Sequence, residues 1–168
     1  MIIAVEKLSV CYFVRELTTA DIPRILTLCS KNEQYYQYCP PQATEQSIVA
    51  DMEALPPGKE KQDKYYVGFF DGERLIAVLD LILAYPDPET AFIGFFMVEK
   101  TMQGAGVGSK IVDEICEYLS RNGFSSVRLG WAKGNPQAEQ FWRKNGFRET
   151  GVTYIGDDYT VIIAQRDI

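Results

Sequence analysis

Within residues 95–119 an apolar run, a glycine-rich turn and a helical pattern follow one another directly. The apolar run ends at Val98, and the turn Gln103-Gly-Ala-Gly-Val-Gly108 begins five residues later. Glycine lets a backbone approach a ligand closely, and the first N–H groups of a helix have no partner within that helix. A strand that leads through such a turn into a helix therefore predicts an anion site, typically for phosphate.

Two common phosphate motifs do not fit this turn. A P-loop requires Gly-Lys followed by Ser or Thr, whereas the residue before Lys110 is Ser109. A dinucleotide fingerprint requires Gly-x-Gly-x-x-Gly early in a βαβ unit, but the glycines of residues 104–108 have a different last spacing and lie past mid-chain. Taken alone, the turn is also compatible with a loop that binds nothing.

Composition narrows the classes of function. The chain has no histidine, which excludes catalysis by Ser-His-Asp or Cys-His pairs. The cysteines form no Cys-x-x-Cys pair, so we expect no zinc site and no metal, and their sparse placement suggests a reducing compartment. The net charge of −6 argues against general nucleic-acid binding.

Length and hydropathy indicate one domain over residues 1–168. The N-terminal residues lack the pattern of a signal peptide, and no apolar window approaches the length of a membrane span. We therefore expect a cytoplasmic protein with neither a membrane nor a nucleic acid as partner.

Hydrophobic periodicity and turn residues predict the order β-α-α-β-β-β-α-β-α-β-β. Helices are expected after Thr18 or Thr19, after Thr44, over 106–120 and from Asn135-Pro136 to Asn145, and 30–42 is expected to be a polar, aromatic loop. Such an order is typical of a mixed α/β sheet with helices on both faces. The expected strands are 10–16, 65–70, 75–83, 91–98, 126–131, 150–155 and 159–165.

Two motifs on this order of elements resemble one family. The turn at 103–108 reads Gln-x-x-Gly-x-Gly and is similar to the acetyl-CoA signature of the GNAT family, the GCN5-related N-acetyltransferases. The second motif is Asn135-Pro-Gln-Ala138 followed by Phe141-Trp142-x-Lys144-x-Gly146-Phe147. The resemblance covers nearly the whole chain. It implies a mostly antiparallel central sheet of six to seven strands with helices on both faces.

The resemblance implies acetyl-CoA as co-substrate. The pantetheine arm would lie beside the strand residues Phe96, Met97 and Val98, where the strand at 126–131 must turn away. Three residues keep a second interpretation. In it Gln103 only orients the loop, Asn135 is a simple N-cap, and the Lys144 side chain is solvated. The other expected contacts come from the turn, the following helix and the second motif: Gln103, Gly104, Ala105, Gly106, Val107, Gly108, Ser109, Lys110, Asn135, Phe141, Trp142 and Lys144.

Three residues are candidates for the chemistry of transfer. The resemblance points to the backbone N–H of Val98 or its neighbour as the group that polarises the acyl carbonyl. Trp142 stands where many members carry a tyrosine thought to protonate the leaving thiolate. An indole is no useful acid but can donate a hydrogen bond to sulfur, and a thiol pKa of roughly 8.5 makes the thiolate a tolerable leaving group.

Asp80 is the third candidate and the first choice as general base. It is the only charge in its apolar strand, so burial would raise the pKa of its carboxyl toward a useful value. The alternative is that Asp80 points outward or ties down a neighbouring strand. Phe92 falls where the histone-modifying branch places its glutamate, so that base is absent. Glu89 is a weaker substitute, and Glu99 is expected to face solvent.

The acceptor is expected to be a cation or an aromatic molecule, because tyrosines and an acidic residue gather before the second helix. A loop that merely covers the core edge would show the same pattern. The candidate acceptor-binding residues are Glu33, Tyr35, Tyr36, Tyr38, Tyr85 and Tyr154.

The resulting hypothesis is an N-acetyltransferase that acts on a primary amine of a small molecule or peptide, by direct attack in a ternary complex. A non-catalytic acyl-CoA sensor or structural module is the alternative, and no residue distinguishes an amine acceptor from an alcohol. The aromatic content and the habit of the family are compatible with a homodimer.

Overall fold

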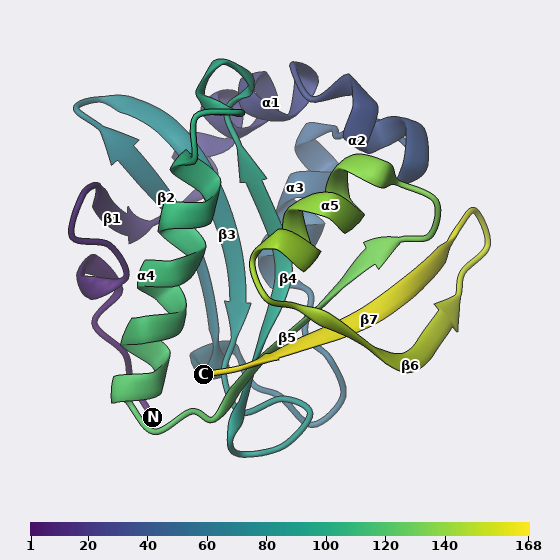
Figure 1. Ribbon diagram of the computed structural model, residues 1–168. Coiled ribbons are helices and arrows are strands. Elements are labelled where there is room, and N and C mark those ends of the chain that lie inside the picture. The colour runs from purple at the N-terminus through teal and green to yellow at the C-terminus, as the bar shows by residue number, and fades with distance from the viewer.

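The computed structural model describes all 168 residues and is built on one seven-stranded sheet (Figure 1). The strands are β1 (Phe13–Glu16), β2 (Lys64–Asp71), β3 (Arg74–Ile82), β4 (Thr90–Val98), β5 (Ser126–Ala132), β6 (Arg148–Ile155) and β7 (Thr160–Asp167). Their order across the sheet is β1-β2-β3-β4-β5-β7-β6, and only the β4–β5 pair is parallel. The expected mixed, mostly antiparallel sheet is confirmed.

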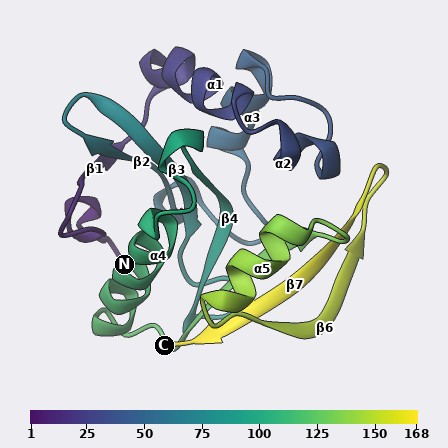
Figure 2. The same ribbon diagram turned by 45° about the horizontal axis from the view of Figure 1, so that its top comes forward.

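Helices cover both faces of this sheet, as Figures 1 and 2 show. One face carries α4 (Val107–Arg121) and α5 (Pro136–Lys144). The other carries α1 (Ile22–Ser30), α2 (Glu33–Tyr38) and α3 (Glu45–Glu53). Short 3-10 turns lie at Val5–Lys7, Thr19–Asp21, Lys61–Asp63 and Lys100–Met102. No helix combines the length and the apolar character needed to cross a membrane.

The two faces bury separate cores. The apolar stripe of α4, with Ile111, Ile115 and Leu119 fully buried, packs on the first face as its four-residue spacing predicts. On the second face Ile25 of α1 and Ile48 of α3 pack against β2 and β3. Because both faces are covered, the central strands are apolar along nearly their whole length.

Local capping places the helix starts where the sequence predicts them. The side chain of Thr18 accepts from the N–H of Ala20, and Thr44 and Ser47 cap each other at the start of α3. The expected N-cap is confirmed at α5, where Asn135 Oδ1 accepts from a backbone N–H three residues ahead.

Two local expectations were wrong. The first strand begins at Phe13 rather than at residue 10, because Ser9 Oγ accepts from the N–H groups of Cys11 and Tyr12 and turns the backbone away from the sheet. Within the expected loop 30–42, residues 33–38 form α2. Its tyrosines pack on the second core, and this tertiary contact overrides the weak local helical signal.

Strands β4 and β5 pair only at their beginnings. Residues 90–93 face residues 126–129, and beyond them the strands part, although β4 continues to Val98 and β5 to Ala132. The predicted divergence beside the glycine turn is thus confirmed. It leaves the second half of β4 without a partner on the β5 side.

A bulge marks the opposite edge of the same half-strand. Asp80 of β3 faces Phe95, and Leu81 faces Ile93, so Gly94 has no partner in the ladder. A bulge inserts one residue and bends its strand locally. Gly94 is exposed.

Candidate active site

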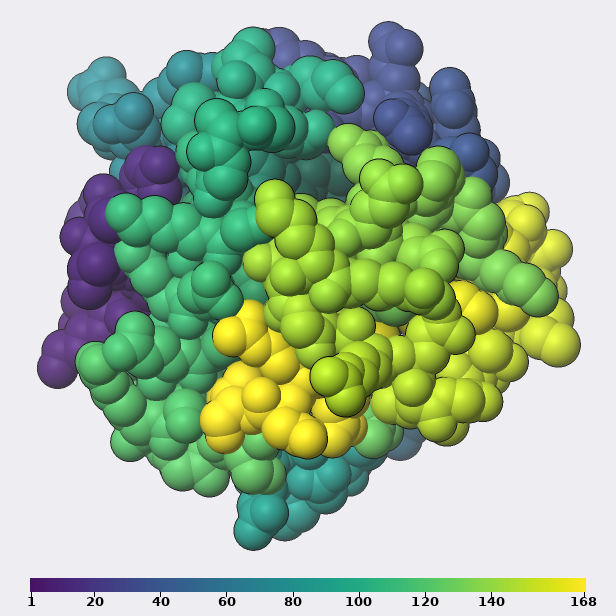
Figure 3. All heavy atoms as spheres, in the orientation of Figure 1, coloured from purple at the N-terminus to yellow at the C-terminus, as the bar shows by residue number.

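A cavity of about 360 Å³ opens where β4 and β5 part. Its walls are the second half of β4, the turn before α4, the inner side of α5 and the junction of α1 and α2. In Figure 3 it is a hollow between the teal residues at the start of α4 and the yellow-green residues of α5.

Most of the expected cofactor residues line this cavity, and three do not. Those that line it are Phe96, Met97, Val98, Gln103, Gly104, Gly106, Gly108, Ser109, Asn135, Phe141, Trp142 and Lys144. The residues outside the lining are Ala105, Val107 and Lys110.

The start of α4 presents free backbone donors to the cavity. Gly106 caps the helix at φ +83°, a conformation that glycine adopts without strain, and the first intrahelical bond runs from Lys110 N to Gly106 O. The N–H groups of residues 107–109 precede that bond and so have no partner in the helix. A Cβ on Gly108 would lie 3.1 Å from Phe141, so a glycine here allows α4 to approach α5 closely.

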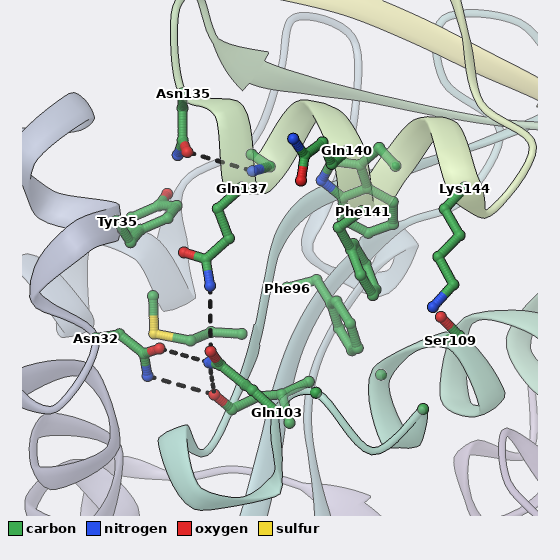
Figure 4. A pocket seen from close by; sticks show the side chains of 17 residues that line it. Asn32, Tyr35, Phe96, Gln103, Ser109, Asn135, Gln137, Gln140, Phe141 and Lys144 are labelled. Atoms are coloured by element: carbon green, nitrogen blue, oxygen red, sulfur yellow. Dashed lines mark hydrogen bonds between the residues drawn. The ribbon is translucent and has the colours of Figure 1, made fainter.

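Two lysines flank this helix terminus, and the structure separates them. Lys144 extends from α5 toward Ser109 across the cavity mouth (Figure 4). Lys110 is exposed and lies beside Cys11, whose side chain raises the pKa of the Lys110 amine. Only Lys144 is therefore placed to meet an anion in the cavity.

Amide side chains tie the end of β4 to both helical layers (Figure 4). Gln103 Nε2 donates to Asn32 Oδ1 at 2.6 Å and to the carbonyl of Val98 at 2.8 Å. Asn32 Nδ2 donates to the carbonyls of Val98 and Leu28, and Gln137 Nε2 donates to Gln103 Oε1. Gln103 is thus engaged in holding the turn, and its amide group does not titrate.

Aromatic rings form the floor of the cavity. Phe96 stacks on Phe141 with ring centroids 6.2 Å apart, and Trp142 packs against Phe96 at 5.8 Å. Trp142 is also in edge contact with Phe147 and is buried, whereas Phe141 is partly exposed. The floor is therefore apolar beside the strand edge.

Asp80 points into the protein on the side of α1 and α3. Asp80 is 7% exposed. Lys64 Nζ donates to Asp80 Oδ2 at 2.8 Å and also donates to the carbonyl of Ala54. The other carboxyl oxygen, Oδ1, is buried without a partner. Burial raises the pKa of the Asp80 carboxyl, and the nearby Lys64 ammonium opposes this only in part.

The candidate acceptor residues divide into two groups. Tyr35 lines the cavity and meets Tyr36 and Phe95 edge to face, with centroids 4.9 Å and 5.9 Å away. Burial raises the pKa of both tyrosines far above the usual value, so both stay protonated. This aromatic group lies beside the bulge of β4.

The remaining acceptor candidates lie away from the cavity lining. Tyr85 packs on the ring of Phe92, and Tyr154 is 60% exposed on β6. Glu33 is exposed and Tyr38 is half-buried on α2. The structure does not bring these four side chains together.

Glu99 is a clear correction, because the expectation that it faces solvent was wrong. It is 5% exposed, and its carboxylate accepts from Arg74 at 2.7 Å and from the N–H of Thr101, with the Lys31 ammonium 3.7 Å away. Burial opposes ionisation, but these hydrogen bonds and charges lower the pKa of Glu99. Glu99 therefore lies directly after β4 as a buried, ionised carboxylate paired with Arg74, and it is not a candidate for the general base.

Sequence reasoning missed three polar residues in the cavity. Gln137 belongs to the second motif and Gln140 lies between its two halves, so their position on α5 was available as a signal. Asn32 had no such signal, because its role depends on the approach of Gln103 from a distant part of the chain. No group of three or more His, Cys, Asp or Glu side chains is arranged to hold a metal ion.

Comparison with solved structures places the fold among acetyltransferases. An acetyltransferase from Thermus thermophilus is similar with a TM-score of 0.74 and 20% identity, over 92% of this chain and 96% of that one. The ribosomal-protein-S18-alanine N-acetyltransferase from Escherichia coli gives 0.67 and 15%, over 92% of each chain. The PaiA N-acetyltransferase from Thermoplasma acidophilum in complex with coenzyme A gives 0.67 and 16%, over 92% and 98%.

Comparison at the level of sequence gives a family but no individual relative. No curated protein sequence matches the chain. A model described as "Acetyltransferase (GNAT) family" matches residues 25–147. That match runs from within α1 past the end of α5 and spans most of the chain, and the protein therefore belongs to the GNAT family of acetyltransferases.

Proposed function

We propose that the protein transfers an acetyl group from acetyl-CoA to a primary amine of a small molecule or peptide, in a ternary complex. One observation carries the proposal. A single cavity joins the free amides at the start of α4 to the unpaired half of β4 and then to Tyr35, whose ring meets Phe95, the β4 partner of Asp80. A donor and an acceptor can thus meet at one strand edge.

The donor end fits the chemistry of coenzyme A. The N–H groups of residues 107–109, at the positive end of the α4 dipole, suit a pyrophosphate, and Lys144 adds a positive charge. The apolar floor and the open edge of residues 96–98 suit the pantetheine arm, which would add to β4 as a strand does.

The register of β4 supplies an oxyanion donor. The N–H of Glu99 donates to the carbonyl of Ile76 on β3, so alternation directs the N–H groups of Val98 and Phe96 toward the parted β5 side. The Val98 carbonyl is already held by Asn32 and Gln103, which fixes the peptide orientation. A fixed N–H aimed at the thioester oxygen stabilises the charge that develops there.

In the proposed reaction the amine nitrogen attacks the thioester carbon, a C–N bond forms and the C–S bond breaks. The attacking ammonium must first lose a proton, and Asp80 would accept it directly or through one water. The thiolate leaves without a strong acid, because Trp142 can donate only a hydrogen bond to the sulfur. The second proton of the nitrogen passes to the departing thiolate or to solvent.

The test is release of free thiol from acetyl-CoA with tyramine, spermidine, kanamycin and a peptide with N-terminal alanine as acceptors. Release with at least one of them supports the proposal. An Asp80→Asn variant should then lose about 10²–10⁴-fold in rate, the usual range for a general base. An exposed control, Asp71→Asn, should keep the wild-type rate.

A non-catalytic acyl-CoA-binding module is the second candidate, favoured by the tryptophan at position 142 and by the Lys64 ammonium on Asp80. It predicts acetyl-CoA binding without thiol release for any acceptor. The expected homodimer and the cytoplasmic location stay predictions.

A further inference from the structure

Glu99 directs its side chain into a second surface groove, separate from the active-site cavity. Successive side chains of an extended chain point to opposite faces of a sheet, and Val98 lines the cavity whereas Glu99 lines this groove. The other walls of the groove are α1 and the start of β3. Glu99 is buried, and a buried carboxylate is costly unless it is paired, so its partners indicate its role.

The Glu99 carboxylate joins three segments of the chain. Its Oε2 accepts from Arg74 Nη2 at 2.7 Å and from the N–H of Thr101 at 3.0 Å. Its Oε1 lies 3.7 Å from Lys31 Nζ, and Arg74 Nη2 also donates to Thr101 Oγ1. The three partners belong to the start of β3, to the 3-10 turn after β4 and to the end of α1. These four residues are called the Glu99 cluster below.

Two members of the Glu99 cluster precede side chains that hold the Val98 carbonyl. Asn32 follows Lys31 directly, and Gln103 lies two positions after Thr101. The amides of Asn32 and Gln103 donate to this carbonyl at 3.3 Å and 2.8 Å (Figure 4). A shift of either segment would therefore move a donor away from the carbonyl.

The third member belongs to the strand that holds the other side of the same peptide. Arg74 begins β3, and the carbonyl of Ile76, two positions further on, accepts from the N–H of Glu99 at 2.7 Å. The peptide between Val98 and Glu99 is thus held at its carbonyl and at its N–H by segments that the Glu99 carboxylate joins. The Val98 N–H, the proposed oxyanion donor, belongs to the peptide directly before it.

We propose that Glu99, through its pairing with Arg74, is a positioning residue for acetyl transfer, which rests on the proposed function. Glu99 does not touch the reacting atoms. Its carboxylate keeps the end of β4 and the turn at 103–108 in a fixed relation, so that the Val98 N–H meets the thioester oxygen. Misplacement of a catalytic group by about 1 Å can cost about 10²-fold in rate, so the effect falls on the chemical step.

The central test is Glu99→Gln, which keeps the shape of the side chain and an oxygen acceptor but removes the charge. We expect kcat with the fastest of the four acceptor amines to fall at least about 10-fold, while the Kd of acetyl-CoA by calorimetry changes less than about threefold. The variant should fold, because the side chains of Arg74 and Lys31 are 52% and 53% exposed and stay in water without their partner. An unchanged kcat, or a loss confined to the Kd, overturns the proposal.

Glu73→Gln is the matched control for this variant. Glu73 lines the same groove and is exposed, and its side chain makes no hydrogen bond or ion pair. It should keep the wild-type kcat and Kd. A loss of kcat equal to that of Glu99→Gln would reveal a general effect of charge in the groove and contradict the proposal.

Arg74→Ala tests the pairing by chemical rescue. We expect kcat to fall as in Glu99→Gln, and guanidinium chloride at millimolar concentration should raise it again at least about twofold, because the space left by Arg74 opens to the groove. The same salt should not rescue Glu99→Gln. Wild-type kcat in Arg74→Ala, or no rescue, would contradict the proposal. If Glu99→Gln does not fold, this half-exposed position decides the question.

Failure of this inference differs from failure of the proposed function. If the wild type releases thiol with none of the four amines, the proposed acetyl transfer is wrong, and nitrogen NMR of the Gln103 side-chain amide decides the inference. This amide is held by two acceptors, and its resonances should move toward solvent-exposed values in Glu99→Gln but not in Glu73→Gln. Unmoved resonances would overturn the inference. If the wild type acetylates an amine and Glu99→Gln matches it, only the positioning role is wrong.

Discussion

At the scale of single residues, the proposed proton transfer depends on the pair Lys64–Asp80. The Lys64 ammonium opposes the rise that burial gives to the pKa of Asp80. Replacing it in Lys64→Met removes that opposition, so the pKa of Asp80 should rise further. A base works only when deprotonated, and the acidic limb of kcat/KM against pH should therefore move to higher pH. An unmoved limb, or one moved to lower pH, would show that Asp80 is not the base.

A second pair of residues makes stability depend on acid. Arg15 donates two hydrogen bonds to Asp21, and with burial opposing it this lowers the pKa of the carboxyl to about 2. The folded pKa lies below the unfolded value of about 3.9, so the stabilisation is present above about pH 4 and is lost as pH falls through about 2. Arg15 is partly exposed, which limits the contribution to about 1 kcal/mol.

Arg15→Met removes the charge together with the guanidinium that lies over the Phe70 ring, 4.5 Å from its centroid. Urea unfolding at about pH 7 should give a free energy lower by about 1 kcal/mol, and the part of this difference that comes from the ion pair with Asp21 should vanish near about pH 2. A difference that persists in acid would assign the loss to packing instead.

At the scale of elements, the two ends of α4 carry glycines in the same conformation but in different surroundings. Gly106 precedes the helix at φ +83° and lines the cavity, whereas Gly123 follows it at φ +91°. Neither has an atom within 4 Å of an added Cβ. Gly106→Ala and Gly123→Ala should therefore destabilise the fold by a similar amount, about 1 kcal/mol each.

Only Gly106→Ala should weaken acetyl-CoA binding, because the strained turn no longer presents its amides to the phosphates. Calorimetry should give a Kd raised at least about 10-fold for Gly106→Ala and unchanged for Gly123→Ala. Equal Kd values for the two variants would show that the phosphates do not bind at the start of α4.

At the scale of the whole molecule, the cavity joins segments that meet only in the folded chain. Asn32, Val98, Gln103 and Asn135 come from four separate elements or loops. Acetyl-CoA at about 100 times its Kd should thus stabilise the fold by about 2.7 kcal/mol. For a chain of this size that corresponds to a rise in Tm of roughly 5–10 °C.

Acetyl-pantetheine, which lacks the nucleotide and its phosphates, provides the control for this measurement. It should raise Tm by clearly less at the same concentration, because it reaches only β4 and the aromatic floor. An equal rise would mean that the turn at 103–108 contributes nothing to binding.

The sequence alone determined the features that depend on neighbours a few residues away. The four-residue spacing in α4, the caps at Thr18, Thr44 and Asn135, and the glycine turn were all predicted, because capping and helical faces involve groups within about one turn. The order of elements and the parting of β4 from β5 followed from these features and from the family resemblance.

Only the tertiary structure decided which distant groups meet. Asn32 accepts a hydrogen bond from Gln103, which lies 71 positions away in the sequence. The Glu99 carboxylate accepts from Arg74, 25 positions away, and the Asp80 carboxylate accepts from Lys64, 16 positions away. The bulge that leaves Gly94 without a partner in the ladder depends on the register between β3 and β4. Register and burial arise from packing of whole surfaces, which no local pattern encodes.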